Sequence, residues 1–320
     1  MNRMPQYYSA TEWVMQLGRG APELADYQDE PAQMDSGCVG KKAYLNLVFA
    51  QQGERSILAK MERRVPYLVQ KALYWDRDMP GLPCVTMIST SGCILQGDRL
   101  VLQVKVEEGA CGHVTSQSAT KINLMNANYA AQVQHLEVER AGYLEFVPEQ
   151  IIPHRHSRFI SETVLRCHPE GTLLYSEILM SGRKYHHQDE RFGFDVYSST
   201  VKVLNADGDE CMSERYVLTP SKGSLDDIGV MQQFDIFANV ILLTSKENQD
   251  RIVSGIKPRF DYENKIARGV SRLPNGVGLV FKVLTNDSGQ AKDEVRQFWK
   301  LAREVCRGVS LTIPYFARQK

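Results

Sequence analysis

The sequence lacks the motifs that mark common catalytic and nucleotide-binding sites. It contains no Gly-x-x-x-x-Gly-Lys-Ser/Thr loop, no Gly-x-Gly-x-x-Gly fingerprint, no Gly-x-Ser-x-Gly elbow and no His-Glu-x-x-His pair. No nucleophile, base and orienting residue can therefore be assigned. We expect that the chain is not an enzyme, and that any nucleotide-driven step needs another protein.

The chain also lacks net charge and long apolar runs. Its 38 Lys and Arg residues balance 38 Asp and Glu residues, so no global electrostatic attraction favours nucleic acid or an anionic membrane. No run approaches the roughly 18 apolar residues of a membrane-spanning helix, and residues 1–20 lack the pattern of a signal peptide. We expect a cytoplasmic protein that binds neither nucleic acid nor membrane.

Cysteine is present but is not arranged for cross-linking. The seven cysteines are dispersed and include no Cys-x-x-Cys pair. This spacing argues against a structural zinc site and against a secreted disulfide framework, and it suits reduced thiols in a cytosol.

Short runs rich in β-branched and aromatic residues dominate the region from 42 to 243. In the run 99–106, apolar residues alternate with Gln103 and Lys105, which is typical of a half-buried strand. Turns containing Gly109, Gly142 and Gly171 recur at intervals of 33 and 29 residues. They are consistent either with stacked units of about three strands each or with ordinary hairpins in a sandwich. Other predicted strands are 43–50, 84–89, 112–116, 131–138, 143–147, 158–166, 172–180 and 191–204.

The spacing of apolar residues changes near the C-terminus from that of a strand to that of a helix. Apolar residues spaced by three and four from Ala291 to Val305 predict a helix that ends before Gly308. Ser245 predicts the start of a shorter helix ending before Pro258, and a hairpin is expected around 274–276. The expected fold is mainly β with two appended helices, forming one domain over 41–320 after a flexible arm at 1–40 in which Trp13, Val14 and Leu17 can dock locally.

His154-Arg155-His156 is the densest group of metal-capable side chains. In an extended segment His154 and His156 share a face and can approach one metal, and imidazole is a ligand for nickel. A hydrogen-bonded surface pair is the alternative, and a partner contact is another. His186 and His187 form a second histidine group, which also fits a simple polar connection.

Three carboxylates are further candidates for metal contact. Asp98 either caps the turn before the strand at 100–106 or contributes, with Glu149 and Glu177, to the acidic wall of an internal path. Glu177 lies within an apolar strand, where a charge requires a partner, and Arg183 is the candidate counter-ion. Cys93 and Cys111 are possible thiolate ligands or packed thiols.

Four ordered blocks resemble the UreD (UreH) family of urease accessory proteins. They are Ser89–Leu100, Thr115–Ile122, Phe146–Pro153 and Gly182-Arg183, which continues to Glu190-Arg191-Phe192. Ser91, Gln96, Ser116 and Ser118 depart from the usual family residues. Residues 1–40 lie outside the resemblance.

The resemblance implies a non-enzymatic scaffold with a helical, β-helix-like stack of strands. It implies direct binding to the accessory protein UreF, recruitment of the GTPase UreG through UreF, and docking on apo-urease. Nickel is expected to pass through an internal channel with only transient contacts, candidates being Asp98, Glu149, Glu177, His154 and His156, and no cofactor is expected to be tightly bound. The alternatives are a structural subunit that never touches nickel and a metal-dependent hydrolase using His154 and His156.

Overall fold

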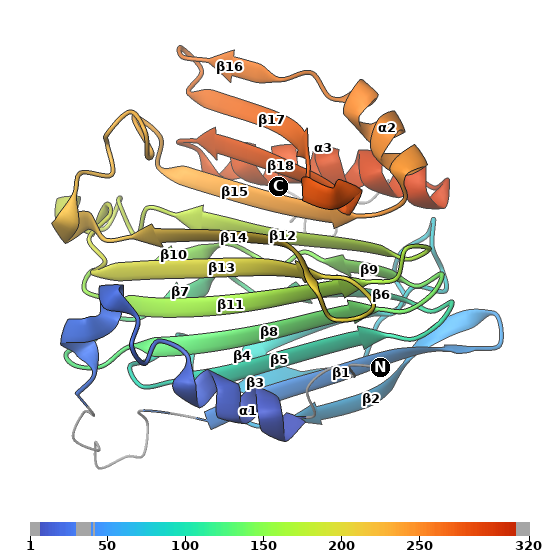
Figure 1. Ribbon diagram of the computed structural model, residues 1–320, viewed down its shortest axis with the longest axis horizontal. Helices are drawn as coiled ribbons and strands as arrows, with labels where there is room; N and C mark the ends of the chain where they lie inside the picture. Colours follow the sequence, from blue (N-terminus) through green and yellow to red (C-terminus); the bar gives the residue numbers. More distant parts are fainter. Residues whose placement is uncertain (1–6, 30–39, 41, 312–320) are drawn as a thin grey trace.

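Two β-sheets make up most of the molecule, which confirms the mainly-β expectation (Figure 1). The computed structural model describes residues 7–29, 40 and 42–311. Sheet A contains, in spatial order, β14 (Glu210–Leu218), β13 (Val196–Leu204), β11 (Arg158–Cys167), β8 (Ala130–Val138), β5 (Arg99–Val106), β1 (Lys42–Gln52) and β2 (Arg55–Arg63). Sheet B contains β16 (Arg259–Asp261), β17 (Ile266–Arg272), β18 (Gly278–Thr285), β15 (Ile236–Leu243), β12 (Thr172–Met180), β9 (Tyr143–Phe146), β6 (Cys111–Ser116), β4 (Cys84–Ser89) and β3 (Tyr67–Val69), with β7 (Thr120–Ile122) and β10 (Ile151–Pro153) beside it.

The chain passes repeatedly from sheet A to sheet B, and equivalent strands pair in parallel. β5, β8 and β11 are neighbours in sheet A, and each is followed through a glycine turn by β6, β9 and β12 in sheet B. The turns are stacked: the Tyr143 amide donates to the Ala110 carbonyl at 2.9 Å, and the Thr172 amide donates to the Gly142 carbonyl at 2.9 Å. The recurring glycines therefore mark stacked units, as one of the two sequence interpretations proposed.

The expectation of a β-helix-like coil is not confirmed. The two sheets do not close on each other, and β12, β15, β18 and β17 pair antiparallel in the later part of sheet B. The predicted strand at 191–204 begins only at Val196, because residues 191–195 belong to the preceding loop.

The core lies between the sheets and is continuous across them. On β5, the side chains of Leu100, Leu102 and Val104 enter this core, as the alternation predicted. The opposite face was expected to be solvated, yet Val101 and Gln103 are also buried. The half-burial prediction was wrong because the N-terminal segment covers this face of the sheet.

That segment forms α1 (Tyr7–Gln16) and the short helix η1 (Pro22–Tyr27). Val14 and Leu24 pack against apolar side chains of sheet A, including Val101 and Val133, and Trp13 and Leu17 pack at the edge of this cluster. The predicted local docking of α1 is confirmed. The flexibility of the arm stays a prediction, and residues 1–6 and 30–39 of it lie outside the described residues.

Both predicted C-terminal helices are present, and they lie beside β15–β18 at the top of the view (Figure 1). α2 (Lys246–Gly255) begins after Ser245, whose side chain accepts a hydrogen bond from the Asn248 amide. α3 (Ser288–Arg307) ends at Gly308, which has φ of 69° and so adopts the left-handed conformation that favours glycine. The apolar face of α3 covers sheet B through residues Ala291, Val295, Phe298 and Ala302. The predicted hairpin is β17–β18, joined through η4 (Pro274–Gly276).

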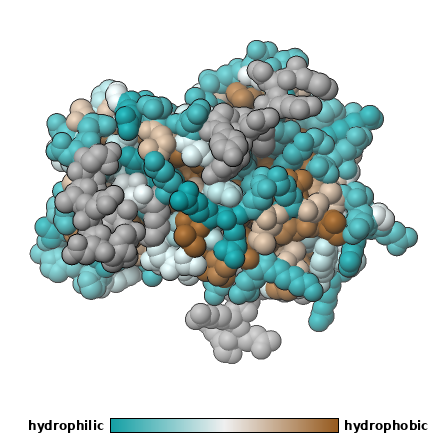
Figure 2. Space-filling model, turned by 90° about the horizontal axis from the view of Figure 1, so that it is seen from below, coloured by the Kyte–Doolittle hydropathy of each residue, from teal (hydrophilic) through white to brown (hydrophobic). Residues whose placement is uncertain are grey.

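The opposite end of the molecule is less well covered. Seen from below, hydrophobic residues gather there among hydrophilic ones (Figure 2). Met61 on β2 is 42% exposed, although its partner Leu47 on β1 is fully buried. Among residues 7–29, 40 and 42–311, nothing fully covers the inner face of sheet A at this edge. Within residues 7–29 and 42–311, no helix is long and apolar enough to cross a membrane.

Candidate functional site

Three of the four sequence blocks meet at one cavity between the sheets. The cavity measures about 120 Å³, and its walls come from residues 89–100, 116–121 and 146–151 together with side chains of β5, β8 and β11. The three blocks lie together because they pair in parallel. Ile94 of the first block bridges to Ile122 of the second, and β7 of the second block pairs with β10 of the third. The blocks are therefore equivalent segments of successive units, and stacking brings them to one place.

The first block forms a turn into β5. Gly92 and Gly97 have φ of 71° and 74°, which most side chains reach only at a cost. Asp98 is fully buried, and its carboxylate accepts a hydrogen bond from the Leu95 amide at 2.9 Å. This is the turn-capping role considered from sequence. Asp98 also lines the cavity, near Tyr67, whose pKa is raised by burial and further raised by the charge of Asp98.

Glu149 is the second predicted carboxylate at the cavity. Its backbone amide donates to the Ser116 hydroxyl at 2.9 Å, which joins the second and third blocks. Its carboxylate forms an ion pair with Lys292 of α3, with 2.5 Å between Oε2 and Nζ. Asp98 and Glu149 are thus brought to one cavity, although each already has a protein partner.

Glu177 does not line this cavity. It is buried at another place between the sheets, where it accepts hydrogen bonds from the phenols of Tyr175, Tyr197 and Tyr216. Burial raises the pKa of Glu177, and the tyrosine hydrogen bonds oppose that effect. The proposed counter-ion was wrong: Arg183 pairs with Glu190 at 2.5 Å, and phenols take its place at Glu177.

His154 and His156 do not share a face, so that prediction was wrong. Residues 154–157 form a turn after β10, and His156 has φ of 56°. His154 is buried, with Nδ1 at 3.3 Å from the Asn123 side-chain oxygen, whereas His156 is exposed and contacts Asp195 at 3.1 Å. Burial lowers the pKa of His154, and the charge of Arg183 lowers it further.

The remaining candidates are also separated. His187 lies in a loop, where its ring accepts a hydrogen bond from the Asp189 amide. Cys93 lines the cavity, whereas Cys111 lies at a different surface hollow beside Ser56. Across residues 7–29 and 42–311, no three His, Cys, Asp or Glu side chains are grouped to hold a metal ion.

Comparison with known proteins identifies the family. A model of the family described as UreD urease accessory protein matches residues 41–317. The chain belongs to the UreD family. The urease accessory protein UreD of Yersinia pseudotuberculosis is 64% identical to it over 295 residues, covering 92% of each chain. UreD of Yersinia enterocolitica is 63% identical over 301 residues, and UreD of Photorhabdus laumondii is 56% identical over 317 residues and covers 99% of each chain.

Membership of the UreD family implies a role in urease maturation, as an accessory protein rather than an enzyme. The resemblance seen in the sequence is thereby confirmed. The family model matches from residue 41 and so covers both sheets and the helices α2 and α3. The helices α1 and η1 precede that match, but the Photorhabdus laumondii relative aligns over 99% of the chain and therefore includes them.

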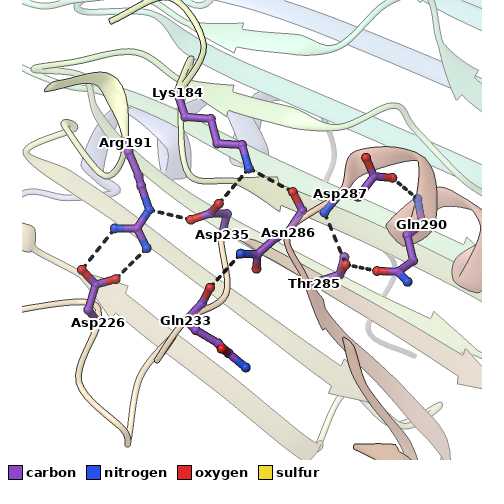
Figure 3. A network of polar contacts seen from close by, with 9 residues as sticks. All are labelled: Lys184, Arg191, Asp226, Gln233, Asp235, Thr285, Asn286, Asp287 and Gln290. Atoms are coloured by element: carbon purple, nitrogen blue, oxygen red, sulfur yellow. Dashed lines mark hydrogen bonds and ion pairs between the residues drawn. The ribbon is translucent and has the colours of Figure 1, made fainter. Parts of the chain in front are cut away.

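The fourth UreD block does not line the cavity, and its residues instead close a loop. A side chain at Gly182 would place Cβ only 2.2 Å from the Glu190 carbonyl oxygen, so the loop can close there only with glycine. Arg191 joins Asp226 and Asp235, and Lys184 binds Asp235 at 2.8 Å and the Asn286 carbonyl at 2.9 Å (Figure 3). This network ties the loop after β12 to the loop before β15 and to the start of α3.

Sequence reasoning missed both this network and a buried ion cluster under α3. Arg303 is fully buried and forms two hydrogen bonds to Glu145, at 2.8 and 2.7 Å, and another to Asp76. His113 contacts the same Glu145 at 3.0 Å. The helix pattern gave no signal for this cluster, because Arg303 lies off the apolar stripe that runs from Ala291 to Val305, and its partners lie 158 and 227 residues away in sequence.

Proposed function

We propose that this chain is a non-enzymatic scaffold in the nickel-insertion step of urease maturation. It binds UreF directly, receives the GTPase UreG through UreF, and docks on apo-urease in the cytoplasm. Nickel is its cargo, held only transiently. Family membership supports the role in maturation, and the successive strand units support a body stacked along one direction.

One observation supports a nickel path. Three of the four family blocks line a single cavity, and they place Asp98 and Glu149 in its wall. Carboxylate oxygens bind divalent cations, and weak successive contacts permit release where a closed ligand set would retain the ion. We propose that Asp98 and Glu149 contact nickel in passing. Glu177, His154 and His156 stay candidates at other positions along the chain.

Reconstituted activation tests this function. The full chain is combined with UreF, UreG, apo-urease, GTP and nickel, and urease activity is measured. Glu149→Gln keeps the shape of the side chain but removes its charge, and we expect activation to fall by about tenfold, which corresponds to 1.4 kcal/mol. Co-purification with UreF should be unchanged. Glu170→Gln is the control, because Glu170 pairs with Arg140 in an exposed turn.

The result also separates the alternative in which the chain is only a structural subunit. Full activation by both Glu149→Gln and Asp98→Asn would favour that alternative, since neither variant keeps the carboxylate charge. If apo-urease became fully nickel-loaded without this chain, the proposed function itself would be wrong.

A further inference from the structure

Glu149 stands at the boundary between two cavities. Pro148 and Glu149 line the 120 Å³ cavity between the sheets, and they also line a second cavity of about 40 Å³ between sheet B and α3. Both volumes exceed the roughly 10–15 Å³ that one water molecule requires. Glu149 is thus the acidic residue that the two cavities share.

Lys292 forms an ion pair with the Glu149 carboxylate. Its ammonium nitrogen is 2.5 Å from Oε2 of Glu149, and the two side chains are 30% and 17% exposed. Lys292 also lines the smaller cavity, as does Arg296. Both groups remain partly exposed to solvent, which weakens their ion pair, so a divalent cation can displace the ammonium group.

The start of α3 fixes the position of Lys292. The Asp287 carboxylate accepts a hydrogen bond from the Gln290 amide at 2.8 Å, which caps the helix, and the Thr285 hydroxyl contacts the Gln290 side chain. Lys184 binds the Asn286 carbonyl, while the Asn286 side chain donates to the Gln233 carbonyl at 2.9 Å (Figure 3). This bracing holds the first turn of α3, and with it Lys292, beside Glu149.

We propose that Lys292 is a competing cation that keeps Glu149 a weak, releasing contact for nickel. The proposal rests on the proposed function and deepens it by naming what limits nickel retention at this position. In this scheme a metal ion at Glu149 competes with the ammonium group for the carboxylate, and the ammonium group re-forms the ion pair when the metal leaves. Lys292 is a positioning residue in this scheme, because its role acts through Glu149.

Nickel binding to the full-length chain tests the proposal. Ni²⁺ alone is titrated calorimetrically at low ionic strength into the wild type and into Lys292→Met, which keeps most of the length of the side chain without its charge. We expect Lys292→Met to bind Ni²⁺ about threefold to fivefold more tightly, the factor that corresponds to removing up to 1 kcal/mol of competition. Lys300→Met is the matched control, because Lys300 also lies on α3 and pairs with Glu304 at 3.9 Å, and it should leave the affinity unchanged.

A double variant assigns the effect to Glu149. In the Glu149→Gln background, Lys292→Met should no longer tighten Ni²⁺ binding. Lys292→Met should also slow urease activation despite its tighter binding, a split that a purely structural role would not produce. Circular dichroism confirms folding of each variant.

The experiments distinguish failure of the Lys292 proposal from failure of the proposed function. Equal Ni²⁺ affinity of the wild type and Lys292→Met, or tighter binding that persists without Glu149, would overturn the role of Lys292. In that case a loss of activation in Glu149→Gln would still support the nickel path. Full activation by Glu149→Gln would instead remove the proposed function on which this inference stands.

Discussion

At the scale of single residues, Glu177 shows how an apolar strand accommodates a carboxyl group. Three phenols surround it, and two of them come from β13 and β14 of sheet A. Buried acceptors with several donors are costly to delete, because each donor loses its partner. The side chain therefore links the two sheets through hydrogen bonds and needs no basic counter-ion.

The raised pKa of Glu177 has a measurable consequence. Burial disfavours the charged form, so the carboxyl group contributes most to stability below its unfolded value of 4.5, and that contribution is lost as the pH rises through the higher folded pKa. Glu177→Gln keeps an oxygen acceptor but cannot ionise. We expect its free energy of unfolding, relative to the wild type, to increase between pH 4.5 and pH 7.5 in urea titrations. A constant difference across that range would contradict the assigned burial effect.

The residue scale also shows where sequence reasoning stops. The cap by Asp98 depends on Leu95, three positions away, and a local rule found it. The pairing of Arg183 with Glu190 spans seven positions but depends on how the Gly182 loop closes. His154 and His156 were misplaced because one residue with positive φ turns an expected strand into a turn. Contacts that depend on loop shape or on distant strands leave no periodic signal in the sequence.

At the scale of elements, the strands with strong patterns were the most predictable. β4, β5 and β12 have the predicted bounds, and the N-cap of α2 and the Gly308 end of α3 follow local capping chemistry. The covering of β5 by α1 was not predicted, since it joins segments about 90 residues apart. An alternating pattern identifies a strand, but it does not reveal what covers the second face.

The packing of the N-terminal segment on sheet A can be tested by a substitution. Leu24 is fully buried against sheet A, so Leu24→Ala should lower the free energy of unfolding by about 2–5 kcal/mol. Loss of protection at residues 7–29 in hydrogen exchange would accompany it. The exposed Leu124→Ala is the control and should have little effect. Unchanged stability in Leu24→Ala would show that the segment is the flexible arm expected from sequence.

His135 makes the docking of α1 on sheet A sensitive to pH. Its ring lies under Trp13, at 5.2 Å between centroids, and burial lowers its pKa to about 4. A group with a lowered folded pKa contributes stability above its unfolded value of 6.5, and this contribution is lost as the pH falls toward 4. Undocking of α1 should therefore begin in that window, and Trp13 fluorescence can follow it.

At the scale of the whole molecule, the core argues for one cooperative unit. Apolar residues of both sheets belong to a single cluster, and α3 is attached to sheet B by its own apolar face and by the Arg303 ion cluster. The sequence analysis predicted one domain over 41–320. The structure adds a physical reason, because neither sheet can bury its inner face without the other.

Three tryptophans allow cooperativity to be tested at separate places. Trp13 reports on α1, Trp75 on the segment between β3 and β4, and Trp299 on α3. Three variants that each retain one tryptophan, with phenylalanine at the other two positions, should show the same urea midpoint as far-UV circular dichroism within each variant. Because Trp299 stacks on His113 of sheet B at 5.2 Å, separation of α3 from the sheets would change its signal first. An earlier transition at Trp299 would mean that α3 and the Lys292 contact form a separately moving unit, whereas an earlier one at Trp13 alone would confine independent behaviour to the arm.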